Sequence, residues 1–199
     1  MVGGSGFAIS ARLAAWAGMT MAVLLVVAAC TTGTAATPNS SSGHTPAATS
    51  PSHTPSTTVS PVDAATQAAL AAYQGMWADF AAAGTTSDWR SPRLSQHATA
   101  YALSTMSRGL YADHYNGLVS RGAPVLHPNV SSVDPPANPT KVIIADCGDD
   151  THWLKYRANN GQLADNTPGG HRLINAVVQK QPDGSWKVTD FGVHDEGTC

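Results

Sequence analysis

The sequence predicts an α+β domain in which two to three helices pack on an antiparallel sheet of about four to five strands. Between residues 61 and 116, apolar side chains recur at the spacing of an amphipathic helix. Beyond Gly122, short runs rich in β-branched residues alternate with Gly, Pro and Asp, which favour turns. Because the helices come first and the strands follow as a block, the order indicates α+β rather than a parallel α/β fold.

Length and charge exclude several classes of protein. The chain has 199 residues, a formal net charge of -2 and 12% charged residues. Such a length suits one domain with extensions. A nucleic-acid-binding protein needs a dense basic patch, which this composition does not supply.

Residues 1–29 are expected to be a lipoprotein signal peptide. Arg12 is the only charged residue before an apolar run from Leu13 to Ala29. A basic flank, an apolar segment and small residues at its end are typical of a secretory signal. Val27–Ala29 followed by Cys30 resembles the bacterial lipobox, in which the Cys is lipidated and becomes the mature N-terminus.

Cys30 is therefore the expected lipidation site, and the protein is expected to be exported and anchored to the outer face of the cell membrane. The membrane is then its first partner. Each buried CH₂ contributes about 0.8 kcal/mol, so more than one acyl chain gives a stable anchor. A plain signal peptide with a chance Cys, and a single uncleaved membrane anchor, remain the alternatives.

Residues 30–60, the lipidated Cys and the segment Thr31 to Ser60, are expected to form a disordered tether. The segment contains nine Thr, seven Ser and four Pro, and no Asp, Glu, Lys or Arg. It buries too little apolar surface to offset the entropy of ordering. Its composition also permits an O-glycosylated stalk.

The first helix is expected from Pro61 to Ala83. Ser60 supplies a capping hydroxyl, Pro61 suits the first helical position, and Asp63 completes the start signal. Large side chains then follow at helical spacing: Leu70, Tyr73, Trp77 and Phe80.

A second helical stripe begins at Ser91-Pro92 and ends at Asn116-Gly117. Its interior contains Ser104, Thr105 and Ser107, which are poor choices inside a helix. The sequence therefore allows a break between Leu103 and Ser107.

The remaining residues predict strands and turns. The expected strands are 125–133, 140–147, 152–157, 171–180 and 185–193. The segment Gln181–Gly184 between the last two has the composition of a hairpin turn.

Two cysteines remain after lipidation, Cys147 and Cys199. In an exported chain an even pair favours a disulfide. Closing the loop between Cys147 and Cys199 would stabilise the fold by about 4 kcal/mol in the chain-entropy model. Two unpaired thiols are the alternative.

The chain from about Asp63 to Cys199 resembles secreted actinobacterial proteins of the nuclear transport factor 2-like, or SnoaL-like, superfamily. The resemblance rests on two N-terminal helices followed by "VIIADCGD", "GGHRL", "DGSWKVTD" and a terminal "GTC". It implies that residues 61–199 form one domain with a curved sheet wrapped on helices into an open cone. Members include ketosteroid isomerase, polyketide cyclases and many binding or scaffold domains, so the fold alone does not determine function.

Isomerase-type chemistry would need a carboxylate base and a hydroxyl donor facing each other in an apolar cavity. The candidates for lining such a cavity are Tyr73, Trp77 and Tyr101, with Asp190 as the base. The competing interpretation makes these aromatic residues core positions and Asp190 a surface residue, so no catalytic residue is assigned.

Two groups of acids and histidines lie near the cysteines, "DCGDDTH" at 146–152 and "HDEGTC" at 194–199. A Cys147–Cys199 bridge would bring them to one end of the sheet. Their spacing matches no zinc or EF-hand pattern, so we expect neither a metal nor a cofactor.

The function expected from the sequence is therefore a cell-surface lipoprotein with a non-catalytic binding or scaffold domain for a protein or small-molecule ligand. The alternative is a small-molecule isomerase or cyclase that uses the cone cavity. A buried carboxylate opposite a Tyr in the cavity would favour catalysis, and an interior filled by Trp and Phe would favour a scaffold.

Overall fold

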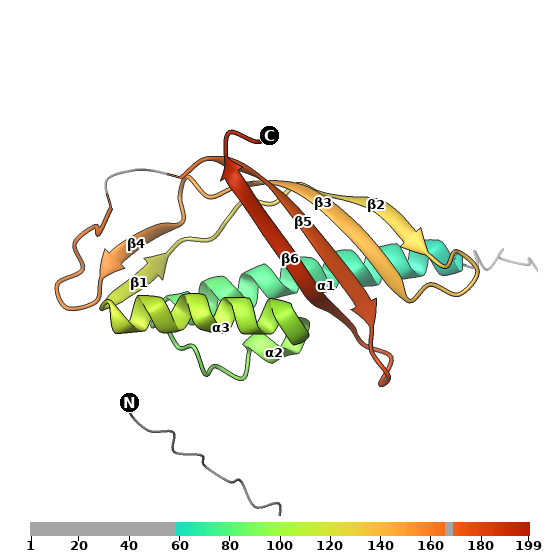
Figure 1. Cartoon of the computed structure of the whole chain (residues 1–199), viewed down its shortest axis with the longest axis horizontal. Coiled ribbons are helices and arrows are strands. Elements are labelled where there is room, and N and C mark those ends of the chain that lie inside the picture. The colour runs from blue at the N-terminus through green and yellow to red at the C-terminus, as the bar shows by residue number, and fades with distance from the viewer. Residues whose placement is uncertain (1–58, 166–168) are drawn as a thin grey trace, which may run out of the picture. The chain divides into compact units, whose positions relative to one another are not determined.

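The computed structural model describes residues 59–165 and 169–199. The predicted signal peptide and nearly all of the tether lie outside these residues. The described chain forms three helices and six strands (Figure 1). They are α1 (Pro61–Gly84), α2 (Leu94–His97), α3 (Ala100–Tyr115), β1 (Leu118–Arg121), β2 (Pro128–Asp134), β3 (Lys141–Asp149), β4 (Leu154–Arg157), β5 (His171–Lys180) and β6 (Trp186–Glu196).

Helix α1 begins where its capping signals predict. Ser60 Oγ accepts a hydrogen bond from the Asp63 backbone N–H at 3.1 Å and donates one to Asp63 Oδ2 at 2.7 Å. Pro61 occupies the first turn, where no intrahelical N–H is needed. The start of the domain at residue 61 is thus fixed by local chemistry.

The second helical stripe is interrupted, but not where the sequence suggests. The chain breaks at Ala98 and Thr99, and α3 then runs without interruption through Leu103–Ser107. Ala98 pairs with Val188 of β6, and the Thr99 N–H donates to the Val188 carbonyl at 2.9 Å. This pairing to a distant strand outweighs helical periodicity, and the break that the sequence allows at 103–107 does not occur.

Four strands form the main antiparallel sheet in the order β2-β3-β5-β6. The strand expected at 152–157 is shorter, and as β4 it pairs with β1 in a separate two-stranded sheet. Strand β1 was not predicted, because Leu118–Arg121 is too short to show a pattern. The hairpin between β5 and β6 turns at Gly184, whose φ of 87° suits glycine.

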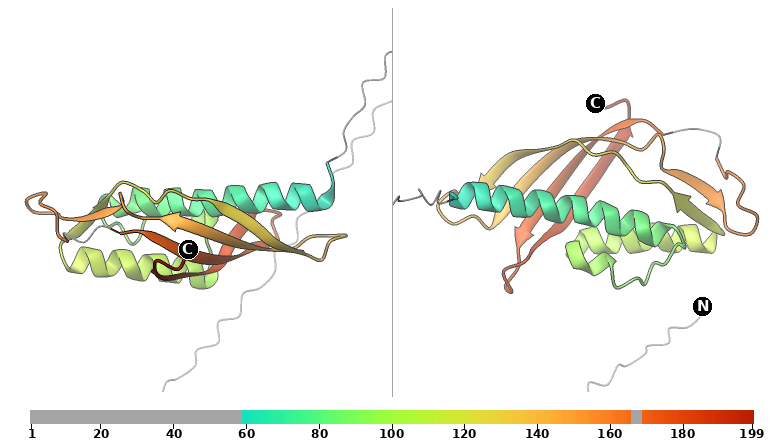
Figure 2. Two further views of the ribbon diagram at one scale, coloured as in Figure 1. Left: turned by 90° about the horizontal axis from the view of Figure 1, so that it is seen from above. Right: turned by 180° about the vertical axis from the view of Figure 1, so that it is seen from behind.

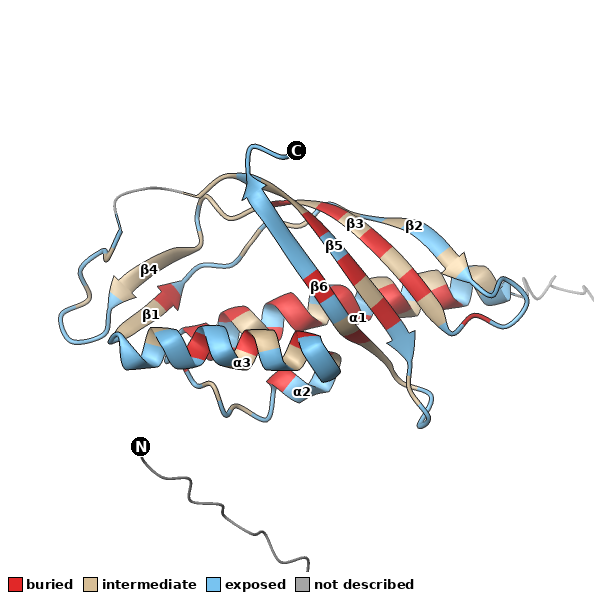
Figure 3. Ribbon diagram, in the orientation of Figure 1, coloured by how far each residue is buried: buried red, intermediate tan, exposed pale blue. Residues whose placement is uncertain are grey.

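The helices cover one face of the main sheet (Figure 2). On β3, Val142, Ile144, Asp146 and Gly148 are buried and alternate with less buried neighbours. The period-two pattern means that the buried set faces α1. Figure 3 shows the same inward face as buried stripes on β3 and β5 and along α1. The α+β class is confirmed.

Candidate functional site

An apolar cavity of about 250 Å³ lies between the helices and the sheet. Trp77 and Phe80 of α1 and Thr105 and Gly109 of α3 form its helical side. The sheet and loops supply the rest of the lining: Pro124, Gly148, Asp150, Trp153, Arg172, Ile174, Phe191 and Val193.

Four aromatic rings form a contiguous cluster along this cavity. The Trp77 ring centroid lies 6.1 Å from Phe80, 6.0 Å from Trp153 and 5.4 Å from Phe191. Phe80 and Trp153 meet at 5.4 Å with an interplanar angle of 83°. Edge-to-face packing of this kind holds each ring in one orientation. The apolar wall is therefore built in advance of any ligand.

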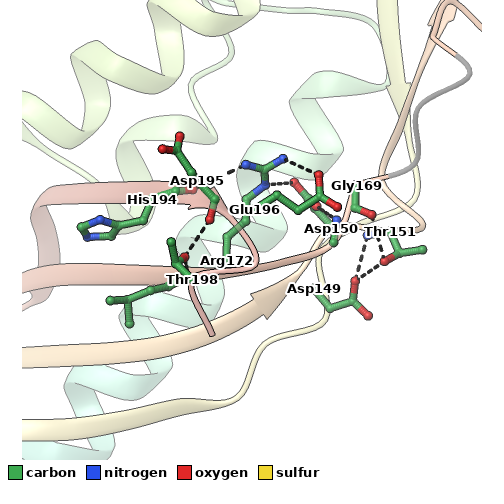
Figure 4. A network of polar contacts seen from close by, with 11 residues as sticks. Asp149, Asp150, Thr151, Gly169, Arg172, His194, Asp195, Glu196 and Thr198 are labelled. Carbon is green, nitrogen blue, oxygen red and sulfur yellow. Dashed lines mark hydrogen bonds and ion pairs between the residues drawn. The ribbon is translucent and has the colours of Figure 1, made fainter.

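The cavity has few polar groups, and two of them form an ion pair. Arg172 Nε lies 3.0 Å from Asp150 Oδ2, and Arg172 Nη2 lies 3.8 Å from Glu196 Oε2. Asp150 Oδ1 accepts a hydrogen bond from the Gly170 backbone N–H at 2.7 Å. Figure 4 shows Arg172 between the two carboxylates. One guanidinium thus bridges the end of β3 to the end of β6.

The first glycine of the "GGHRL" segment is required by a close approach to Asp150. A Cβ on Gly169 would lie 2.0 Å from Asp150 Oδ1 and 2.8 Å from the Asp150 backbone carbonyl oxygen, which cannot move aside. A Cβ on Gly170 would lie 2.7 Å from Glu196 Oε1, but that side chain is half exposed and can turn away.

The disulfide Cys147–Cys199 is present, with a Cα–Cα distance of 5.8 Å that lies in the usual range of about 4.4–6.8 Å. It ties β3 to the segment that follows β6. Thr198 Oγ1 adds a second tie by accepting from the Leu173 backbone N–H at 2.9 Å. Because Asp150 and Glu196 each lie three residues from a bridged Cys, the bridge also holds the acidic groups near each other.

Asp149 is set apart from this pair by its own neighbour. Thr151 donates to Asp149 Oδ1 from its hydroxyl at 2.5 Å and from its backbone N–H at 2.9 Å. These two hydrogen bonds lower the pKa of Asp149 below its usual value. Within residues 59–165 and 169–199, no group of three or more His, Cys, Asp or Glu side chains has an arrangement that could hold a metal ion.

A second polar feature lies deeper. The Tyr73 hydroxyl donates to Asp146 Oδ2 at 2.8 Å, and the His127 backbone N–H donates to Asp146 Oδ1 at 2.6 Å. Tyr73 is 0% exposed and Asp146 2%. Burial raises the pKa of Tyr73, and so do the charge of Asp146 and the hydrogen bond to it. Neither residue is among those that line the cavity.

No family model matches the chain, and no curated protein matches it. Solved structures are similar at low identity. The intermembrane-space region of the chloroplast protein ARC6 is 15% identical, with 61% of this chain and 97% of that chain covered and a TM-score of 0.32.

A ketosteroid isomerase-like protein from Erwinia carotovora atroseptica is 12% identical, covering 63% of this chain and 91% of its own, with a TM-score of 0.39. A protein from Catenulispora acidiphila is 17% identical, covering 65% and 93%, with a TM-score of 0.37. These likenesses concern the arrangement of the chain and say nothing of its activity.

The cavity candidates from the sequence fall in different places. Trp77 lines the cavity, and Tyr73 lies behind it in the core. Tyr101 is 56% exposed on α3, where Arg108 lies over its ring at 5.5 Å, so it is not a cavity residue. Asp190 is exposed and lies at a β-bulge in β6, next to the inward-facing Phe191, so it is not a base in the cavity.

Sequence reasoning missed the residues that matter most here. Asp146 lies on the buried face of β3 with Val142 and Ile144, but residues 142–145 are all apolar, so the sequence shows no alternation that would reveal an inward carboxylate. The sequence predicts Trp153 inside the strand at 152–157, whereas it precedes β4. The partners of Arg172 cannot be predicted, because pairing across strands cannot be read from one segment.

Proposed function

We propose that this protein is an exported lipoprotein, held at the outer face of the cell membrane by lipid on Cys30, whose domain binds a small molecule without transforming it. We extend the proposal to membership of the nuclear transport factor 2-like superfamily. No nucleic acid takes part. Within the described residues no helix is both long and apolar enough to span a bilayer.

The observation that carries the binding function is the cavity itself. Its walls are aromatic and aliphatic, with a few convergent polar groups at one side, which is the usual make-up of a ligand site. Its volume of about 250 Å³ is just below the usual range of about 300–1,000 Å³, so the ligand is small.

The non-catalytic part of the proposal rests on Tyr73 and Asp146. They are the described pair that most resembles an acid and base, and each uses its hydrogen-bonding groups on the other or on the backbone of His127. A general base must lie within hydrogen-bond reach of the proton that it abstracts. Neither side chain meets the space in which a ligand would sit.

Binding in the cavity is tested by filling it. A Cβ on Gly109 would meet only Phe80 Cζ at 3.8 Å, which is an ordinary contact, so Gly109→Leu adds a side chain at the cavity edge without a clash at its base. Ligand-observed NMR with a small fragment library should find binders of the wild type that Gly109→Leu does not bind. Ala112→Leu, at an exposed position of the same helix, is the matched control and should bind as the wild type does.

Equal binding of the same fragments by Gly109→Leu and the wild type would contradict the cavity as the binding site.

The anchor is tested separately. Cys30→Ala should release the protein from the membrane fraction or leave the precursor unprocessed. The lipid is attached through a thioether, and Cys30 supplies the thiol next to Val27–Ala29. Metabolic labelling with a fatty acid should mark the wild type only. Lipidation would be contradicted if the wild type took up no labelled fatty acid and were still processed normally and retained in the membrane fraction.

The alternative function, a small-molecule isomerase or cyclase, is favoured by one observation, the buried Tyr73–Asp146 hydrogen bond of 2.8 Å. It requires the cavity to open toward that pair. Conversion of a β,γ-unsaturated cyclic ketone to its conjugated isomer, followed by ultraviolet absorbance and lost in Tyr73→Phe, would support the enzyme. We expect no conversion.

A further inference from the structure

The end of the main sheet beside the cavity carries an excess of negative charge. Strand pairing brings Asp149 opposite His171, and Arg172 opposite both Gly148 and Glu196. The charged groups gathered there are Asp149, Asp150, Asp195, Glu196 and Arg172, with His194 beside them (Figure 4). His171 is the register partner of Asp149, and His152 follows Asp150 by two residues. Four carboxylates and one guanidinium leave this end negative when the histidines are neutral.

Among the described residues, Arg172 is the one Lys or Arg of this group, and it is already paired. Arg172 is paired with Asp150 at 3.0 Å and Glu196 at 3.8 Å, and its Nη1 donates to the His194 carbonyl at 3.5 Å. An anionic ligand could still reach an N–H of Arg172 that makes no hydrogen bond among the described residues, but it would then face the carboxylates around that guanidinium. This end of the sheet therefore disfavours a ligand that carries a carboxylate or a phosphate.

Asp150 is the acid that meets the cavity. A carboxylate has about four lone-pair sites, and those of Asp150 hold only the Gly170 N–H and Arg172 Nε among the described residues. It retains capacity to accept an N–H donor from a bound molecule. Its charge also acts without a direct contact, because the apolar walls screen it less than water does.

The aromatic cluster of Trp77, Phe80, Trp153 and Phe191 favours the same sign of charge. The face of an aromatic ring carries negative electrostatic potential, and indole attracts a cation most strongly. Both indoles, Trp77 and Trp153, line the cavity. Cation–π attraction to the indoles and the charge of Asp150 thus both favour a positively charged ligand.

We propose that the cavity binds a small organic ammonium ion, with its charged nitrogen near Asp150 and its hydrocarbon part against the aromatic cluster. This inference rests on the proposed binding function and names its ligand class. Charge complementarity selects it: the apolar walls exclude a fully hydrated inorganic cation, and the carboxylates around Arg172 oppose an anion.

Three probes of equal size and different charge test the class: benzylammonium, benzyl alcohol and benzoate. Calorimetric titration should rank them in that order, with benzylammonium at least about tenfold tighter than the alcohol and benzoate weakest. Raising the ionic strength should weaken benzylammonium and leave benzyl alcohol unchanged, since salt screens only the charged ligand.

Asp150→Asn should reduce the preference for benzylammonium over benzyl alcohol to about twofold or less, because the carboxylate facing the ligand is gone. Asp183→Asn is the matched control. It removes the same charge from an acid in the β5–β6 turn. Asp183 accepts hydrogen bonds from Ser185 and does not line the cavity. This control should keep the wild-type ranking.

The wild-type series tests the class without relying on a variant that folds poorly. Benzyl alcohol or benzoate binding as tightly as benzylammonium would overturn the ammonium class and leave the binding function standing. Failure of all three probes up to millimolar concentration would overturn the class too. The binding function itself is judged by the comparison of Gly109→Leu with the wild type.

Discussion

Asp146 is a carboxylate buried between α1 and β3, and two donors keep it in place. Each oxygen accepts one hydrogen bond, from the Tyr73 hydroxyl and from the His127 backbone N–H. A buried charge without such partners would cost several kcal/mol. The pair therefore fixes how α1 sits on the sheet, and it joins the sheet to the segment that leads into β2.

Tyr73→Phe should destabilise the domain by about 1–3 kcal/mol, because Asp146 Oδ2 then loses its donor while the ring is kept. Denaturant unfolding of the two proteins at pH 7 measures the difference. Trp77→Phe is a poor control because it changes the cavity, whereas Tyr111→Phe on the exposed face of α3 removes a hydroxyl of the same kind and should cost little. A loss as large in Tyr111→Phe would contradict the role of the buried bond.

Tyr73 also predicts a response to alkali. Burial raises the pKa of Tyr73 above its usual value of about 10, with the charge of Asp146 and the bond to it acting in the same direction. The folded state therefore favours the neutral phenol, and this contribution to stability is complete below about pH 10 and is lost as the pH rises above it. Wild-type stability should fall above about pH 10 more steeply than that of Tyr73→Phe, as followed by unfolding at a series of pH values.

At the scale of elements, replacing a glycine by alanine has different consequences in α1 and in α3. A Cβ on Gly75 would lie 2.7 Å from ring atoms of His97, whose Nδ1 is 2.7 Å from the buried Asp79 Oδ2. The ring can move away only by giving up that contact between α1 and α2. A Cβ on Gly109 meets Phe80 at 3.8 Å, which needs no movement.

Gly75→Ala should therefore destabilise the domain by about 1–3 kcal/mol, the usual cost of overpacking, reduced by the gain in helix propensity. Gly109→Ala should stabilise it by about 0.5–1 kcal/mol, since the propensity gain is unopposed. Thermal unfolding of both variants measures the two signs. The same sign in both would contradict the close approach of His97 to α1.

The elements that could be predicted are those whose signals are local. Ser60, Pro61 and Asp63 define the start of α1, and the run of β-branched residues at 142–144 indicates β3. The break at Thr99 could not be predicted, because its cause is a hydrogen bond to Val188, which is distant in sequence. The cavity was harder still, since Asp150 and Arg172 become neighbours only through strand register.

At the scale of the whole domain, the disulfide closes the end of the sheet that carries Asp150 and Arg172, two residues that line the cavity. Cys147 lies near the end of β3, and Cys199 follows β6, 52 residues later. The Gly197 N–H donates to the His171 carbonyl at 2.8 Å, so backbone and side-chain bonds add to the covalent one. The bridge and these hydrogen bonds together link the ends of three neighbouring strands, β3, β5 and β6.

Cys199→Ser should lower the free energy of unfolding by about 4 kcal/mol, the entropy that a bridge over this separation removes from the unfolded chain. That is a large share of the usual stability of about 5–15 kcal/mol. Denaturant unfolding with and without reductant measures it. Reductant should shift the wild-type midpoint and leave that of Cys199→Ser unchanged, and Cys147→Ser should behave as Cys199→Ser does.

Cys199→Ser should still fractionate with membranes if Cys30 carries the anchor, because anchor and bridge are separate bonds on one chain. Loss of membrane association without loss of protein would mean that the bridged end of the sheet, rather than the lipid, holds the protein at the surface.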